Sequence, residues 1–145
     1  MLLPLLKHRE IAIKDAAKTV LSGFREKASF EVVLSGLVDM KDRAMRADLI
    51  DVFSRAKQTS LLAAIDAICE KEKKLSVPEK FQIARALSRL GAKGREGILA
   101  RFLEDSAYEV RVASLDTVRK TRLKELGPKV VAMLDDKVWQ VQAAA

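Results

Sequence analysis

Apolar side chains recur along this chain at intervals of three and four residues. The clearest run consists of Ile13, Ala16, Ala17, Val20, Leu21 and Phe24. The same spacing returns within residues 30–38, 61–69 and 83–90. Such intervals place apolar residues on one face of an α-helix, whereas a strand requires strict alternation, which no segment sustains. The pattern therefore predicts an all-α protein.

The apolar runs and the breaks between them predict ten short helices in five pairs. The first members are expected near 2–8, 30–39, 60–72, 95–104 and 128–134, and the second members near 10–22, 42–56, 78–90, 107–120 and 137–145. Ser29, Ser76 and Ser106 are predicted N-caps, the last two with a glutamate three residues later as in a capping box. Gly91 follows an apolar run, where a glycine can take positive φ and end a helix. The charged run at 70–74 is expected to lengthen a helix or to form a loop.

One segment is repeated. Residues 103–113, LEDSAYEVRVA, return at an offset of 31 as residues 134–144, LDDKVWQVQAA. A fixed period in this size range is typical of stacked units that bury their apolar faces against their neighbours. Aligning the second helices of the pairs places one residue of each in a common column. The column is Ile13, Met45, Phe81, Val110 and Val141.

The repeated motif resembles that of a known family. Asp105 followed by VRVA at 110–113 resembles the bacterial HEAT repeat, including the shorter type named after phycobilisome lyases, and residues 13–17 and 141–145 resemble the same helix. The resemblance implies a right-handed α-solenoid of about five HEAT-like helix pairs, with one helix of each pair outside and the other lining a concave face. It implies no chemistry. The whole chain, 1–145, is expected to form one such domain, with repeats near 2–24, 29–56, 59–90, 95–122 and 128–145.

Composition excludes several classes of chemistry. Hydrophobic residues make up 49% and charged residues 32% of the 145 residues, as in a folded domain. Cys69 is the only cysteine, which rules out an internal disulfide and a thiolate zinc cage. His8 is the only histidine, which argues against His-based metal clusters and against Ser-His or Cys-His catalysis. We therefore expect a protein that is not an enzyme and that needs no metal or cofactor.

The two ends of the chain give further expectations. No run of 18 apolar residues is present and the first residues do not form a signal peptide, so we expect a cytoplasmic protein without membrane insertion. The sequence stops inside the last expected helix, at 143–145. The chain is therefore expected to be a fragment of a longer protein, whose C-terminal face self-associates or frays.

Acidic residues before the second helices, together with a basic residue within them, suggest a ladder. Asp105 and Asp136 are expected to accept hydrogen bonds from N–H groups at the helix starts, while Arg111 reaches the aspartate of a neighbouring turn. Arg46 is a weaker analogue of Arg111. A ligand-binding role is the alternative, and we favour the ladder because equivalent positions in repeats usually serve packing.

Basic residues also fall on the polar side of the second helices. They are Lys14, Lys18, Arg46, Arg85, Arg89, Arg111, Arg119 and Arg122. Together with the net charge of +7, they predict a basic stripe on the concave face that binds phosphates or an acidic protein segment. Aspartates are interleaved with these residues, so a solvated face of mixed charge is the simpler interpretation.

Two aromatic residues occupy equivalent positions. Tyr108 and Trp139 each lie two residues before the column residue of their helix. They are candidates for a stacking platform or a peptide anchor. We favour the interpretation that they cover the turn between paired helices.

The sequence thus supports three hypotheses about function. The first is a non-catalytic scaffold that binds a protein partner through its concave face, where the basic stripe would suit an acidic partner. The second is binding of a nucleic-acid backbone by the basic stripe. The third, suggested by the repeat type alone, is a subunit similar to chromophore lyases.

Overall fold

The computed structural model describes residues 27–145, with side chains from residue 32 onward. Within this range the regular structure is helical and no strand occurs. The elements are α3 (Lys27–Val38), α4 (Arg43–Arg55), α5 (Leu61–Lys71), α6 (Val77–Leu90), α7 (Glu96–Leu103), α8 (Tyr108–Thr121), η1 (Lys124–Leu126), α9 (Gly127–Ala132), η2 (Met133–Asp135) and α10 (Trp139–Ala144). The all-α prediction is confirmed for the described residues. The helices expected at 2–8 and 10–22 lie outside them.

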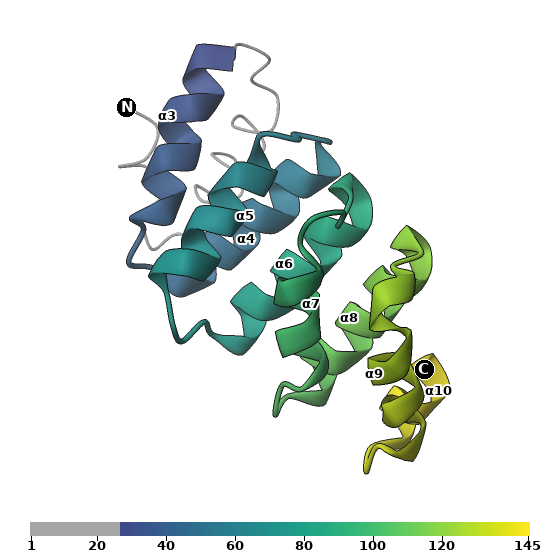
Figure 1. The fold of residues 1–145 in the computed structure, drawn as a ribbon. Helices are drawn as coiled ribbons and strands as arrows, with labels where there is room; N and C mark the ends of the chain where they lie inside the picture. Colours follow the sequence, from purple (N-terminus) through teal and green to yellow (C-terminus); the bar gives the residue numbers. More distant parts are fainter. Residues whose placement is uncertain (1–26) are drawn as a thin grey trace.

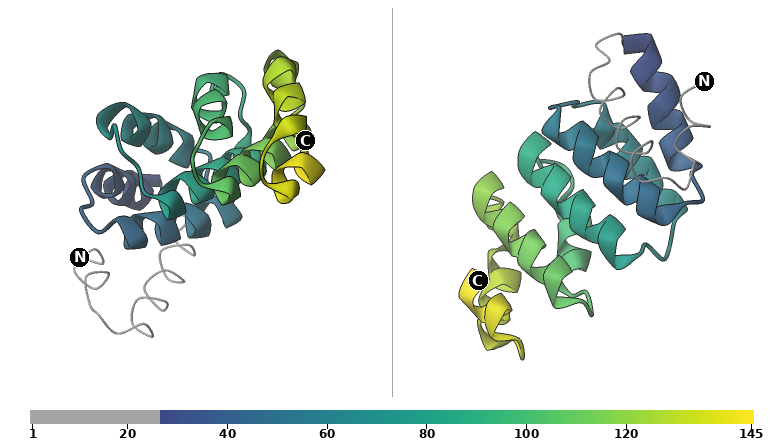
Figure 2. Two further views of the ribbon diagram at one scale, coloured as in Figure 1. Left: turned by 90° about the horizontal axis from the view of Figure 1, so that it is seen from below. Right: turned by 180° about the vertical axis from the view of Figure 1, so that it is seen from behind.

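The helices form two layers (Figure 1). We call α4, α6, α8 and α10 the even layer, in which each helix packs against the next, and α3, α5, α7 and α9 the odd layer. Viewed from below, α5, α7 and α9 stand in a row above α4, α6 and α8 (Figure 2, left). Viewed from behind, the even helices lie side by side and nearly parallel (Figure 2, right). Their N-terminal ends therefore share one edge of the molecule and their C-terminal ends the other.

A continuous aliphatic core lies between the two layers. The even layer contributes residues such as Leu49, Ile83 and Val118, and the odd layer contributes Ile65 and Leu99, all of which are buried. This burial supplies the main driving force for packing, at about 25 cal/mol for each Å² of apolar surface removed from water. No helix in the described part of the chain is both long enough and apolar enough to cross a membrane.

The helix ends follow local rules, with two exceptions to the sequence prediction. Ser76 forms a complete capping box with Glu79, and Gly91 ends α6 at a φ of 108°. Ser29, in contrast, lies inside α3, which begins at Lys27, so its assignment as a cap is wrong. The capping box at Ser106 is also wrong: the N-cap of α8 is Ala107, whose N–H donates to the carboxylate of Asp105 at 3.0 Å. Asp105, one residue before Ser106, performs the role that the serine was expected to have.

The register of the repeat differs from prediction at one helix. The N-caps of the even helices, Asp42, Ser76, Ala107 and Val138, are 34, 31 and 31 residues apart. Counting three residues from each N-cap places Met45, Glu79, Val110 and Val141 in the same column, and all four are buried. Phe81, the predicted member, lies two residues further on and is only partly buried. The prediction is wrong there because a glutamate occupies the buried position and an apolar residue was expected.

Candidate functional site

Ion pairs tie the starts of α6, α8 and α10 to the even helix before each of them. We call this set the start ladder, and its rungs are Arg46–Glu79, Lys80–Asp105 and Arg111–Asp136. Each cation lies four residues after the N-cap of its helix. In the last rung Arg111 binds the two carboxylate oxygens of Asp136 through Nε at 2.9 Å and Nη2 at 2.8 Å. The ladder predicted for Asp105, Arg111 and Asp136 is confirmed.

The first rung is the most buried. The side chain of Arg46 is 1% exposed and that of Glu79 is 0% exposed, and their closest atoms, Nη2 and Oε1, are 2.5 Å apart. Arg46 also approaches the carboxylate of Glu72 at 3.5 Å. The prediction that Arg46 belongs to an exposed basic stripe is therefore wrong. A glutamate that follows it by 33 residues draws the arginine inward instead.

Tyr108 and Trp139 begin α8 and α10 at equivalent positions, as predicted, but they remain accessible to solvent. Their exposed fractions are 38% and 70%, so the interpretation of Trp139 as a cover for the turn is wrong. Val77 stands at the same position of α6 and is 41% exposed. The N-terminal edge of the even layer therefore presents a row of three apolar side chains to solvent.

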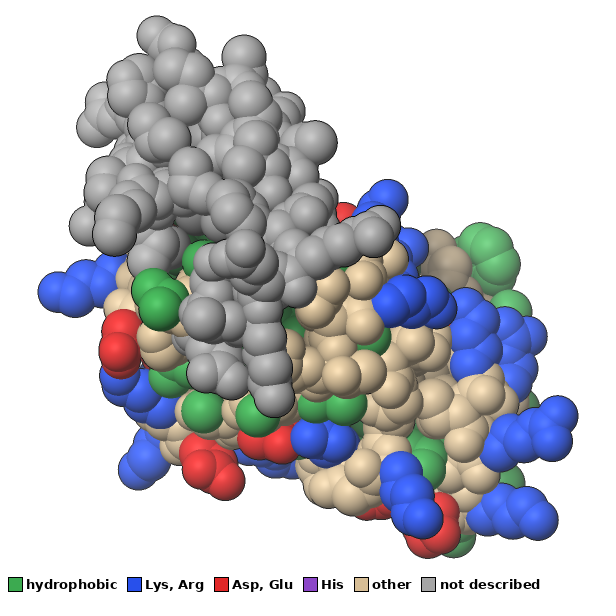
Figure 3. Space-filling view, turned by 90° about the horizontal axis from the view of Figure 1, so that it is seen from above, with side chains coloured by type: hydrophobic (Ala, Val, Ile, Leu, Met, Phe, Trp, Pro, Cys, Tyr) green, Lys and Arg blue, Asp and Glu red, His purple; other side chains and the backbone are tan. Residues whose placement is uncertain are grey.

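The C-terminal edge of the even layer is basic. Arg122 ends α8 in the left-handed conformation. Lys57 and Lys93 lie in the turns after α4 and α6, and Lys124 begins η1 after α8. None of these four forms an ion pair with another described residue. The view from above shows Lys and Arg side chains projecting on the right of the molecule (Figure 3). We call Lys57, Lys93, Arg122 and Lys124 the basic edge. Cations at helix C-termini also offset the negative end of the helix dipole.

A groove opens between α6 and α8 on the side of the even layer that faces away from the odd layer. Its volume is about 280 Å³. Its lining residues are Phe81, Arg85, Ser88, Arg89, Val112, Ala113, Asp116, Thr117 and Lys120. The guanidinium of Arg85 lies 5.5 Å from the centre of the Phe81 ring, which is a cation–π arrangement. This groove is the candidate functional site because it combines an apolar floor with several cations.

The other predicted residues of the basic stripe are distributed unevenly around the groove. Arg85 and Arg89 line it, and Arg119 lies beside it on α8, paired with Asp116 at 2.6 Å. Arg122 belongs to the basic edge. Lys14 and Lys18 lie outside the described residues. The described residues of the predicted stripe therefore do not form one surface. Arg46 and Arg111 belong to the start ladder, Arg85 and Arg89 line the groove, and Arg122 belongs to the basic edge.

Opposite charges near the groove are well matched except at one residue. Burial raises the pKa of Asp51, but hydrogen bonds from Arg55 and Arg89 outweigh it, so the pKa is lowered overall. Hydrogen bonding from Lys120, opposed by burial and aided by Arg119, lowers the pKa of Asp116. Both carboxylates are therefore ionised at neutral pH. Arg85 has no carboxylate partner among the described residues.

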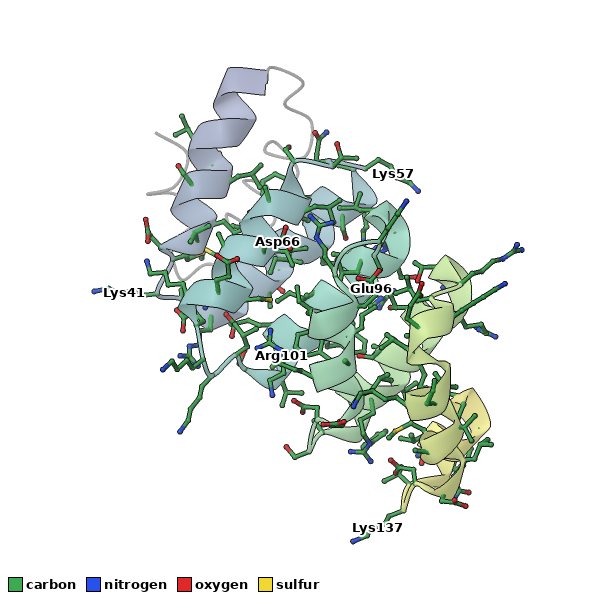
Figure 4. All side chains as sticks on the ribbon, in the orientation of Figure 1. Lys41, Lys57, Asp66, Glu96, Arg101 and Lys137 are labelled. Carbon is green, nitrogen blue, oxygen red and sulfur yellow. The ribbon has the colours of Figure 1, made fainter. Side chains whose placement is uncertain are left out.

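A second cavity lies on the opposite layer, between α5 and α7, with a volume of about 700 Å³. Asp66 of α5 and Arg101 of α7 line it (Figure 4), and Asp66 is bound by Arg95 at 2.7 Å. Burial raises the pKa of Cys69, which also lines the cavity, to about 11. The sulfur is therefore held as a thiol and is not an activated nucleophile. The described residues contain no group of metal-ligating side chains.

Comparison of the chain with protein-family models, with curated proteins and with solved structures finds no match. The functional reading therefore depends on the geometry of this chain itself.

Sequence reasoning missed part of the groove. Phe81 was assigned to the core column, and Ser88, Val112 and Lys120 were not singled out. A usable signal was present, because SVPE at 76–79 fixes the start of α6. Counting from that start aligns the polar positions of α6 and α8 and shows that Arg85 stands where α8 has Asp116.

The start ladder makes the protein sensitive to acid. Hydrogen bonding from Arg111, with a further bond from the Val138 N–H, lowers the pKa of Asp136 below its ordinary value of 3.8. Near pH 4 the unfolded chain therefore binds more protons than the folded one, and stability falls as pH drops through the folded-state pKa. We expect the urea midpoint to fall between pH 5 and about pH 3.

The variant Asp136→Asn tests the source of this sensitivity. It is expected to be less stable at pH 7 and to lose less on acidification, because its amide cannot titrate. The matched control is Asp135→Asn, at an exposed neighbour that makes no ion pair among the described residues. An acid profile of Asp136→Asn identical to that of the wild type would contradict the assignment.

Proposed function

We propose that this chain is a HEAT-like α-solenoid scaffold, without catalytic activity, that binds a protein partner through the groove between α6 and α8. Three observations support the solenoid arrangement: the regular spacing of N-caps, the two helix layers and the start ladder that recurs from one even helix to the next. In this arrangement the even layer lines the concave face.

The observation that carries the binding role is the composition of the groove. It offers apolar side chains, Phe81 and Val112, next to the cations Arg85 and Lys120 on two packed helices. Protein interfaces commonly place aromatic and arginine side chains at their centre, where both apolar contact and charge contribute. The phosphates of a nucleic-acid backbone bind to cations but gain nothing from contact with apolar side chains.

Binding of a nucleic-acid backbone is the second candidate, and the basic edge favours it. Lys57, Lys93, Arg122 and Lys124 form no ion pairs among the described residues and are available to phosphates. Such binding would weaken steeply with salt, because each contact releases counterions.

Site-specific photo-crosslinking separates these candidates. A benzoylphenylalanine replaces Ser88 in the groove or, as the matched control, the exposed Ala63 on α5. Both variants are irradiated in extract of the source cells at 50 and 300 mM salt. We expect a discrete protein adduct from position 88 alone. Adducts removed by nuclease would favour the second candidate, and equal adducts from both positions would contradict a groove-centred role.

A further inference from the structure

The even helices carry a recurring pattern of charge near their C-terminal ends. Nine residues after the N-cap, α4 has Asp51 and α8 has Asp116, whereas α6 has Arg85. Thirteen residues after the N-cap, α4 has Arg55, α8 has Lys120 and α6 has Arg89. The pattern is therefore an acid followed by a base in α4 and α8, and two bases in α6.

Between α4 and α6 this pattern makes a complete set of contacts. Asp51 binds Arg55 of its own helix at 2.9 Å and Arg89 of the next even helix at 2.9 Å. Arg89 also donates to the hydroxyl of Ser54 at 2.8 Å. One carboxylate thus holds two cations from adjacent helices.

Between α6 and α8 the equivalent carboxylate is missing. By the same register an acid at position 85 would bind Arg89 and Lys120, as Asp51 binds Arg55 and Arg89, but Arg85 stands there instead. Lys120 pairs with Asp116 of its own helix at 2.8 Å. Ser88, the counterpart of Ser54, makes no hydrogen bond through its hydroxyl to any residue that the structure describes. The groove opens at this position, and Arg85 is held there over the Phe81 ring.

We propose that the groove binds the carboxylate of an acidic protein segment, which takes the place that Asp51 occupies in the preceding repeat. The ligand carboxylate accepts from Arg85 and Lys120 and from the hydroxyl of Ser88. An apolar side chain next to it in the ligand packs on Phe81 and Val112. This proposal rests on the proposed protein-binding role and names its ligand chemistry.

The groove favours a protein carboxylate over a nucleic-acid phosphate for two reasons. Its floor is apolar, because Phe81, Val112 and Ala113 line it, and these side chains pack against an apolar side chain of a peptide. At about 280 Å³ the groove also accommodates a few side chains and not a strand of nucleotides.

The variant Arg85→Asp tests the inference by supplying the missing carboxylate from within the chain. The new aspartate would bind Arg89 or Lys120 as Asp51 binds Arg55 and Arg89. We expect the melting temperature to hold or to rise by about 1–2 °C. The matched control is Arg101→Asp, which reverses an exposed arginine on α7.

Ligand preference is measured by selecting a display library of random 12-residue peptides on the wild-type protein and on both variants. We expect wild-type and Arg101→Asp selections to be enriched in peptides that pair an acidic with an apolar residue. We expect the selected peptides to bind Arg85→Asp at least tenfold more weakly. Exchanging the peptide's acid for its amide should cost about tenfold on the wild type and little on Arg85→Asp, as coupled partners require.

Selected peptides without acidic residues, bound equally by Arg85→Asp, would overturn the carboxylate site while leaving a protein-binding role intact. Failure to select any peptide, with salt-sensitive binding of a 20-nucleotide single strand, would overturn both. A fall in the melting temperature of Arg85→Asp beyond that of Arg101→Asp would show that the position does not resemble that of Asp51.

Discussion

Replacing Glu79 by glutamine is expected to lower the free energy of unfolding by about 3–5 kcal/mol, because the buried and charged guanidinium of Arg46 loses its close counterion and keeps the more distant carboxylate of Glu72 at 3.5 Å. Both side chains are essentially inaccessible to solvent, so water cannot replace the lost partner. Glutamine keeps the size of glutamate and still accepts the N-cap hydrogen bond. The measured change therefore reports mainly on charge.

Urea denaturation at pH 7 measures this effect, with Glu109→Gln as the matched control. Glu109 is an exposed glutamate in the first turn of α8, where its loss should cost less than about 0.5 kcal/mol. The double variant Arg46→Met with Glu79→Leu should recover most of the stability, since apolar replacement of a buried pair is often neutral or better. A loss from Glu79→Gln no larger than that of the control would refute the buried pair.

Replacing Val110 by aspartate should destabilise the protein by several kcal/mol, about 3–5, through the burial of an unpaired carboxylate. Val110 is 0% exposed and occupies the same column as Glu79. The column tolerates glutamate in α6 because Arg46 meets it. The cation that could meet an aspartate at position 110 is Lys80 of α6, which is already bound to Asp105. Aspartate is also one methylene shorter than glutamate and reaches less far.

Thermal unfolding followed by circular dichroism compares this variant with Arg119→Ala. The Arg119 side chain is 74% exposed, and its ion pair among the described residues is with Asp116 of its own helix, so its removal should change stability by less than about 0.5 kcal/mol. Equal shifts in the melting temperature would show that the column assignment is wrong.

Helical periodicity was enough to locate the helices of the described region. The helix expected at 42–56 is found at Arg43–Arg55, and the one expected at 107–120 is found at Tyr108–Thr121. These boundaries were predictable because the apolar spacing and the turn residues are local features. The start ladder between α8 and α10 was equally predictable, since its residues are repeated in the sequence.

The fate of Arg46 was not predictable in this way. Whether an arginine on a helix is buried depends on what the next helix places against it, which the periodicity of one helix does not report. Here the expectation that every residue of a buried column is apolar led to Phe81 being assigned to the column. The residue that actually occupies it, Glu79, was therefore not recognised as the partner of Arg46. The same error concealed the groove, because Phe81 was counted as core and Arg85 was not compared with Asp51 and Asp116.

In every rung of the start ladder the cation precedes its acid in the chain, by 33, 25 and 25 residues. During synthesis, each new even helix therefore finds its anchoring side chain already made. The loop closed at each step is short and similar in length, so its entropic cost hardly grows as the chain lengthens. The even helices can consequently pack in the order in which they are translated. Each ion pair can form as soon as its acidic residue has left the ribosome, because the cation has left before it.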